Sequence, residues 1–347
     1  MWRRYAGIAR DECGGKQVRG ACFVLEVAGI LVKGVALVES DSGWGRFGCT
    51  EKGKHMNAKI LVHAHVFYPD IWRDVKECID SIAKVIARDS VDVYITYPSG
   101  HREIEDVTSD AVGAKRIPLQ NAGFDIGSFF YVISSVDIDA YDYVVKLHTK
   151  RDVHPAVYVN FRPLEGPEWR NELLSFCRTE RAFRRTLAAF ERQPALGMVA
   201  GRRVIDPSGR VFNVEECRTE DLVENLSLAV KGRTCVYGTM FMARAALLRP
   251  YIGKVCFSDF IPQGPTGGYL RRQQDFIGAC EYSFGMVIEA QGYFVTDGRF
   301  PLWLACVHFR ILGLIYGAVR RLSAVRRCFH FVSKICACTL LYFVVVV

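Results

Sequence analysis

The amino-acid sequence predicts an α/β fold, in which an open and mostly parallel sheet is flanked by helices. From residue 59 onward, short runs rich in β-branched residues alternate with amphipathic segments, which is typical of βαβ units. The connections in such units are almost always right-handed, so helices cover both faces of the sheet. Ligands bind such sheets at the carboxyl ends of the strands, and the residues that follow each strand are therefore the first candidates for a site.

The region from residue 59 to residue 147 alternates regularly. The run 59–66 is short, apolar and rich in β-branched residues, so we expect a buried strand there. Pro69 and Asp70 then begin a helix over 71–88, where isoleucine and valine recur at helical spacing. The same alternation predicts strands at 91–97, 114–118 and 141–147, and helices at 103–112 and 125–136.

Beyond residue 151 the order of the elements changes. Residues 168–192 carry apolar side chains at helical spacing and predict one helical stretch. Short apolar runs bounded by turn residues are typical of strands, and both patterns continue to residue 290. We expect strands at 196–200, 234–244 and 287–290, a helix that begins at 245 and a helix over 275–284.

Composition and charge exclude several classes of protein. The 347 residues are 50% hydrophobic and 24% charged, which is too apolar for a disordered chain. Residues 303–347 carry six of the eight net positive charges and no acid, so the rest of the chain sums to only +2. A nearly neutral body argues against a nucleic-acid partner. The lack of a run of 18 uncharged apolar residues argues against a polytopic membrane protein.

The thirteen cysteines are scattered along the chain and contain no C-x-x-C pair. The closest pair, Cys336 and Cys338, has no histidine cluster near it, so neither a zinc site nor a disulfide framework is predicted. We expect reduced and mostly buried thiols, as in a cytosolic protein.

Three regions are expected along the chain. Residues 1–55 lack periodicity and contain Gly-rich turns, which predicts a poorly structured N-terminal extension, and residues 56–300 carry the α/β pattern. Residues 301–347 form a basic, apolar tail of helical character that suits an anionic membrane surface. Its last thirteen uncharged residues are too few to span a bilayer comfortably, and the alternative is a C-terminal helix packed on the body.

The first candidate site is the turn before the helix predicted over 125–136. Gly123 and Gly127 permit a close approach of the backbone to a ligand. Asn121 or Asp125 is placed to contact a nucleotide or a sugar, beside a helix N-terminus that favours anions. The alternative is that Asp125 serves only as a helix cap.

The second candidate site follows the strand predicted over 141–147. Lys146, Lys150 and Arg151 leave the sheet at its carboxyl edge together with His148 and Thr149. Cationic side chains there suit a diphosphate, either bound or as a leaving group, and His148 suits a phosphate or a sugar hydroxyl. The alternative is a solvated loop.

Two weaker candidates lie in the C-terminal half. Gly238 and Thr239 interrupt an aromatic strand, where the glycine lets a sugar ring or the backbone approach, although such a strand is more often core. Asp275 and Glu281 lie a little under two turns apart on one helix, so we do not expect them to act together. Either one is a candidate general base toward an acceptor hydroxyl, and the alternative is a surface carboxylate.

Taken in order, these segments resemble a known family. The motifs NAGFDIGSF, YDYVVKLHTKR, the pair Trp169-Arg170, ALGMVAG, YGTMFMAR and QQDFIGACE, over roughly residues 58–300, resemble the rhamnan synthesis protein F family. These are bacterial glycosyltransferases of polysaccharide assembly. The resemblance implies a Rossmann-like GT-A domain that transfers a sugar, commonly rhamnose, from a nucleoside-diphosphate donor, and it adds Trp169 and Arg170 to the substrate-binding candidates.

The resemblance also implies partners and a location. They are a nucleoside-diphosphate sugar, a saccharide acceptor, either free or lipid-linked, and the inner face of the plasma membrane, where the basic tail would anchor a cytoplasmic enzyme. Many GT-A enzymes hold a divalent metal with an Asp-x-Asp motif after a strand, but here His148, Thr149 and Lys150 follow the strand. We therefore expect no metal, with Lys150 and His148 neutralising the diphosphate. The missing motif keeps an alternative open, a catalytically silent carbohydrate- or nucleotide-binding module in an assembly complex.

Overall fold

A computed structural model of the chain describes residues 3–10, 17–27 and 30–37 as strands. It also describes residues 58–299, except 112, 152–156, 160–161, 165, 208–217 and 262–266. The chain divides into two compact units, Met1–Lys54 and His55–Val347. The predicted tail 301–347 lies outside the described residues. Among the helices that are described, none is long and apolar enough to cross a membrane.

The first unit contains a small antiparallel sheet with the strand order β1-β2-β3. The strands are β1 (Arg3–Arg10), β2 (Gln17–Val27) and β3 (Ile30–Leu37). Regular pairing here differs from the poorly structured extension expected from the sequence. The apolar and β-branched residues of β2 and β3 supply the strand propensity. The division of the whole chain into three regions stays a prediction.

The second unit is built on a seven-stranded sheet with the order β14-β10-β13-β7-β4-β5-β6. All neighbouring strands are parallel except that β13 is antiparallel to both of its neighbours. This mostly parallel sheet confirms the predicted α/β fold class. Its strands are β4 (Ile60–His65), β5 (Val91–Pro98), β6 (Lys115–Leu119), β7 (Tyr143–His148), β10 (Leu196–Ala200), β13 (Phe241–Arg244) and β14 (Phe294–Thr296).

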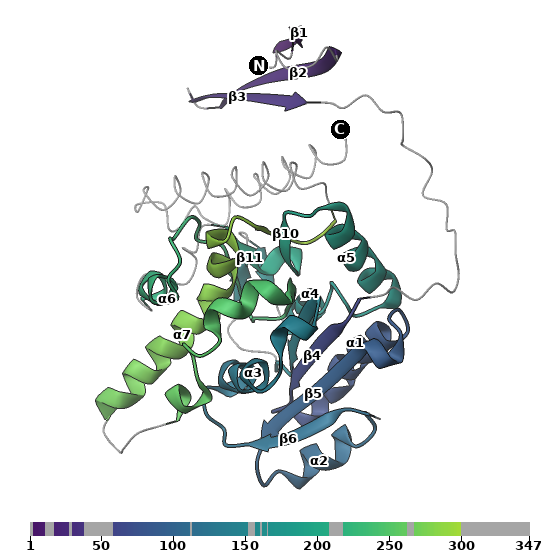
Figure 1. Cartoon of the computed structure of the whole chain (residues 1–347), viewed down its shortest axis with the longest axis vertical. Helices are drawn as coiled ribbons and strands as arrows, with labels where there is room; N and C mark the ends of the chain where they lie inside the picture. Colours follow the sequence, from purple (N-terminus) through teal and green to yellow (C-terminus); the bar gives the residue numbers. More distant parts are fainter. Residues whose placement is uncertain are drawn as a thin grey trace. The chain divides into compact units, whose positions relative to one another are not determined.

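Helices lie on both faces of this sheet, with α3 and α7 on one side of strands β4 to β6 and α1 and α5 on the other (Figure 1). An aromatic cluster of Phe129, Phe130, Phe241 and Phe284 fills the space under α3 and α7. The helices are α1 (Trp72–Ala83), α2 (Arg102–Thr108), α3 (Phe124–Ser135), α4 (Gly166–Leu173), α5 (Glu180–Arg192), α6 (Thr219–Asn225) and α7 (Gly267–Ala290). Two short pairs complete the unit, β8 (Val157–Val159) with β9 (Arg162–Leu164), and β11 (Ile205–Asp206) with β12 (Cys235–Val236).

Three predicted elements differ from the structure. The strand expected at 287–290 is wrong, because these buried residues form the last turn of α7, and the strand β14 follows after Gly292. The helix expected over 168–192 is broken into α4 and α5. The strand expected over 234–244 is two short strands, because Gly238 and Thr239 turn the chain at φ values of 71° and 48°.

Five cysteines of the second unit whose side chains the structure describes are free. Four of them are buried and one is exposed, which agrees with the expectation of mostly buried thiols. The buried ones are Cys78, Cys177, Cys235 and Cys280, and the exposed one is Cys256.

The order of the strands creates a switch point between β4 and β7. The chain steps outward from β4 to β5 and β6 on one side, and then returns to add β7 on the other side of β4. Crevices form outside the carboxyl ends of the strands at such a point, and ligands bind in them. His65, the last residue of β4, pairs directly with His148, the last residue of β7.

The antiparallel strand β13 brings a distant loop to the same place. Its first residue, Phe241, pairs with Lys146 near the end of β7. The turn at Gly238 and Thr239, which comes just before Phe241, therefore lies at the carboxyl edge of the parallel strands. If β13 were parallel to β7, this turn would lie at the opposite edge of the sheet.

We expect Gly127→Ala to destabilise the domain, although alanine favours helices. A Cβ at Gly127 of α3 would lie 2.1 Å from the carbonyl oxygen of Ala122, and such overpacking costs about 1–3 kcal/mol or more. Urea unfolding measures the loss. Gly100→Ala is the control, because a Cβ there meets nothing within 4 Å and only its positive φ is strained. Equal stability of Gly127→Ala and the wild type would contradict this close approach.

Candidate functional site

A buried ion pair lies at the centre of the switch point. Lys146 of β7 is 0% exposed, and its Nζ lies 2.5 Å from Oδ2 of Asp125 in the first turn of α3. The hydroxyl of Thr239 completes a triangle, because its Oγ1 lies 2.8 Å from Nζ and 3.0 Å from Oδ2. An ammonium group cannot be buried in a sheet without such partners. Lys146 therefore fixes the positions of the first turn of α3, which carries Asp125, and of the turn that carries Thr239.

The ion pair sets the charge of Asp125. Burial opposes ionisation of this carboxyl, which is 17% exposed, but His148 and Lys146 outweigh that effect and hold the pKa of Asp125 well below its usual range. Burial lowers the pKa of Lys146, and the attraction of Asp125 opposes that fall. Asp125 is thus a permanently ionised group, and its expected role as a helix cap is taken by Gly123.

His148 is a buried, neutral histidine that holds the turn before β13. Its Nε2 lies 2.7 Å from the carbonyl oxygen of Gly238 and 3.8 Å from Oδ2 of Asp125. Nδ1 also faces a carbonyl oxygen, that of Thr149, but at the longer distance of 3.3 Å. A carbonyl oxygen can only accept, so the shorter contact assigns the proton of the neutral imidazole to Nε2. Burial lowers the pKa of His148 to about 4, so the ring is neutral at pH 7.

Glu281 faces the same cluster from α7. Burial raises the pKa of its carboxyl, and the charge of Asp125 raises it further. The cations Lys150 and Lys146 oppose this rise, as does a hydrogen bond from the backbone of Gly238. The backbone of Gly238 therefore holds His148 through its carbonyl oxygen and also lowers the pKa of Glu281.

The turn that carries these contacts is strained. Gly238 and Thr239 both have left-handed backbone conformations, and a β-branched residue rarely adopts one. The side chains of Trp169 and Leu173 in α4 pack against Gly238 so closely that a Cβ on it would lie 3.2 Å and 2.5 Å from them. The structure around the turn thus holds it in this conformation.

Two histidines of the site were not predicted. His63 and His65 of β4 are buried on the same face as Lys146 and His148, and both bond to the hydroxyl of Thr96, at 2.9 Å and 3.0 Å. Burial lowers the pKa of His63 well below its usual range and that of His65 to about 3. The two histidines are separated by one residue within an apolar run, which puts both on the same face of a strand. This spacing was the signal in the sequence by which they could have been found.

Three other predicted residues lie at the edge of the cluster. Asn121 is exposed in the loop between β6 and α3. Gly127 packs against the backbone of that loop. Thr149 is buried, and its hydroxyl accepts hydrogen bonds from the N–H groups of Phe67 and Tyr68, so it ties the end of β7 to the end of β4.

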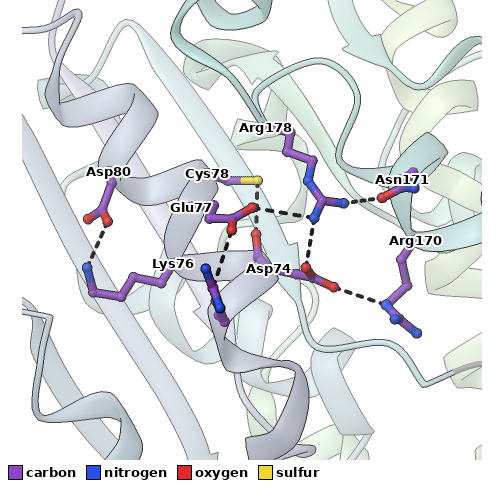
Figure 2. A network of polar contacts seen from close by, with 9 residues as sticks. Asp74, Lys76, Glu77, Cys78, Asp80, Arg170, Asn171 and Arg178 are labelled. Atoms are coloured by element: carbon purple, nitrogen blue, oxygen red, sulfur yellow. Dashed lines mark hydrogen bonds and ion pairs between the residues drawn. The ribbon is translucent and has the colours of Figure 1, made fainter. Parts of the chain in front are cut away.

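Three further candidates have surroundings other than the Lys146–Asp125 ion pair. Trp169 is buried beneath the Gly238 turn. Arg170 pairs instead with Asp74 of α1, at 3.1 Å (Figure 2). Asp275 is partly exposed on α7. Of the two predicted acids on this helix, the structure brings Glu281 to the switch point.

Two of the predicted residues, Asp125 and His148, have partners other than a metal. Divalent metal ions take free carboxylate oxygens or imidazole lone pairs, but Asp125 is paired with an ammonium group, and the Nε2 proton of His148 faces a carbonyl. In the described part of the chain, no three His, Cys, Asp or Glu side chains gather as a metal would require.

Comparison with known proteins gives one finding on the family. The model of the family described as rhamnan synthesis protein F matches residues 47–267, which include every loop of the cluster and stop before Glu281. A comparison with curated proteins gives no match.

The buried histidines make stability depend on pH. An unfolded histidine has a pKa near 6.5, whereas that of His65 is about 3 in the folded chain. Between these values the unfolded state binds more protons, so the free energy of unfolding falls as the pH falls, by about 1.4 kcal/mol per pH unit for each such histidine.

We therefore expect His65→Gln to reduce this slope between pH 6 and pH 5 by about 1.4 kcal/mol per unit. Urea unfolding at several pH values measures it. The exposed His101 supplies the control, His101→Gln, which should keep the wild-type slope. An unchanged slope in His65→Gln would show that this ring is not buried in its neutral form.

Proposed function

Because the chain belongs to the rhamnan synthesis protein F family, a family of polysaccharide synthesis, we propose that it is a glycosyltransferase. It moves a sugar from a nucleoside-diphosphate donor to a growing surface polysaccharide. The observation that carries the proposal is the polar cluster at the switch point, where one ionised carboxylate, one carboxylate of raised pKa and two lysines meet. Open α/β sheets bind their ligands at this place.

The donor diphosphate lies on the side of the cluster formed by Lys150. This residue follows β7 and is partly exposed, whereas Lys146 is committed to Asp125. Lys150 is the cation that can reach a ligand while it also balances the two carboxylates. Its charge stabilises the diphosphate as it leaves, which is the task of a metal ion in related folds. We propose a GT-A-like, metal-independent donor site.

Glu281 acts as the general base. It takes the proton of an acceptor hydroxyl while the hydroxyl oxygen bonds to the anomeric carbon and the bond to the diphosphate breaks. A raised pKa suits this role, because a carboxylate with a higher pKa is the stronger base. Asp125 stays ionised and holds the framework. Two carboxylates with divergent environments commonly divide the work in this way.

The family and the composition of the tail support our proposals for the sugar, the acceptor and the location. Rhamnose is the proposed sugar, and a saccharide carried on a membrane lipid is the proposed acceptor. The six cationic residues of 303–347 would hold the enzyme at the anionic inner face of the plasma membrane. The second candidate function, a catalytically silent module that binds nucleotides or saccharides, is favoured by the absence of an Asp-x-Asp motif after β7.

The experiment is donor hydrolysis with a panel of nucleotide sugars, in which water replaces the acceptor. We expect Glu281→Gln to lower kcat about a hundredfold or more and to leave the Kd for nucleoside diphosphate within about threefold. Asp275→Asn is the matched control on the same helix and should keep activity. Equal losses in the two variants would remove Glu281 from its role. Binding of oligosaccharide with no hydrolysis of any donor would favour the silent module.

A further inference from the structure

An acidic residue of α1, outside the cluster, joins three segments of the chain. The side chain of Asp74 is 23% exposed and forms two ion pairs. Its Oδ2 lies 3.1 Å from Nε of Arg170 in α4, and its Oδ1 lies 2.8 Å from Nη2 of Arg178. Arg178 also bonds to Asn171 and pairs with Glu77 at 3.4 Å. Figure 2 shows a dashed line from Asp74 to each of the two arginines, which end on different oxygens of its carboxylate. Charge-assisted bonds at a partly buried carboxylate are stronger than exposed ion pairs.

The helix held by Asp74 is the one that packs on the strained turn. Arg170 is next to Trp169, whose buried indole ring lies against Gly238, and Leu173 of the same helix closes on it from one turn further along. On its other side, α4 is fixed by Glu172, which accepts a hydrogen bond from the N–H of Arg203 at 2.9 Å. Asp74 thus supplies the attachment of α4 to α1.

The strained turn at Gly238 and Thr239 holds side chains of the cluster in position. The carbonyl of Gly238 fixes His148, and the next residue, Thr239, bonds to Asp125. The backbone of Gly238 also acts on Glu281, because it lowers the pKa of that carboxyl. Strained backbone persists only where the surrounding structure over-determines it. If α4 loosens, the turn can relax and Glu281 loses its alignment.

We propose that Asp74 is a positioning residue, which holds α4 against the Gly238 turn and thereby aligns Glu281 for proton transfer. The inference rests on the proposed function, since it gives Asp74 a task in that reaction. It also predicts a structural change that does not depend on the reaction. Without the Asp74 carboxylate, the packing of Trp169 on the turn should change.

The chain offers a matched control on the same helix. Asp80 lies six residues after Asp74 in α1 and forms an ion pair of 2.7 Å with Lys76. Figure 2 includes this pair, which has no drawn contact with Arg170 or Arg178. Asp80→Asn therefore removes a charge and an ion pair from α1 without touching α4.

The experiment measures donor hydrolysis and an NMR signal in the full chain. In Asp74→Asn we expect kcat to fall about tenfold or more, as for a small misplacement of reacting groups, while KM for the donor stays within about twofold. The indole N–H signal of Trp169, assigned by its loss in Trp169→Phe, should shift. Asp80→Asn should change neither quantity. Asp74→Ala provides a stronger second variant if asparagine still accepts one arginine.

Each outcome decides a separate point. If kcat in both Asp74 variants falls no further than in Asp80→Asn, or falls with the Trp169 signal in its wild-type position, Asp74 has no positioning role. If the wild-type chain hydrolyses no donor, the proposed function fails. In that case the Trp169 signal alone decides whether Asp74 holds the turn, and an unmoved signal overturns the inference.

Discussion

The second unit depends on one interaction, the ion pair between Lys146 and Asp125. A lysine at 0% exposure in a central strand is tolerable only when an anion reaches it, and breaking a buried pair by removing one partner costs about 3–5 kcal/mol. Because the anion belongs to α3 and the third partner, Thr239, belongs to the turn before β13, three segments distant in sequence must meet at one place. That place is the switch point of the sheet.

The same interaction separates the two carboxylates of the cluster. Asp125 lies against the ammonium group and is ionised, whereas burial and the charge of Asp125 raise the pKa of Glu281. Around them the histidines His63, His65 and His148 are neutral. The site therefore contains few mobile protons, and in our proposal the carboxylate of Glu281 is the group that exchanges one.

Much of this arrangement could be predicted from the sequence, and some of it could not. The periodicity from residue 59 to residue 147 predicted β4 to β7, and the rule on strand ends pointed to Asp125, Lys146 and His148. The reversed direction of β13 left no local trace, because a short apolar run looks the same in either direction. Periodicity also could not predict which side chains meet across the fold. It did not show that Glu281, rather than Asp275, faces the cluster, or that Arg170 binds Asp74.

The central claim is that one side-chain cation at the mouth of the sheet, Lys150, performs the task of a metal ion toward a diphosphate. Calorimetric titration of the full chain with a nucleoside diphosphate in the presence of a strong chelator tests it most directly. The account predicts that binding persists in the chelator and weakens at least tenfold in Lys150→Ala. Binding that disappears in the chelator, returns with manganese and is indifferent to Lys150 would contradict it.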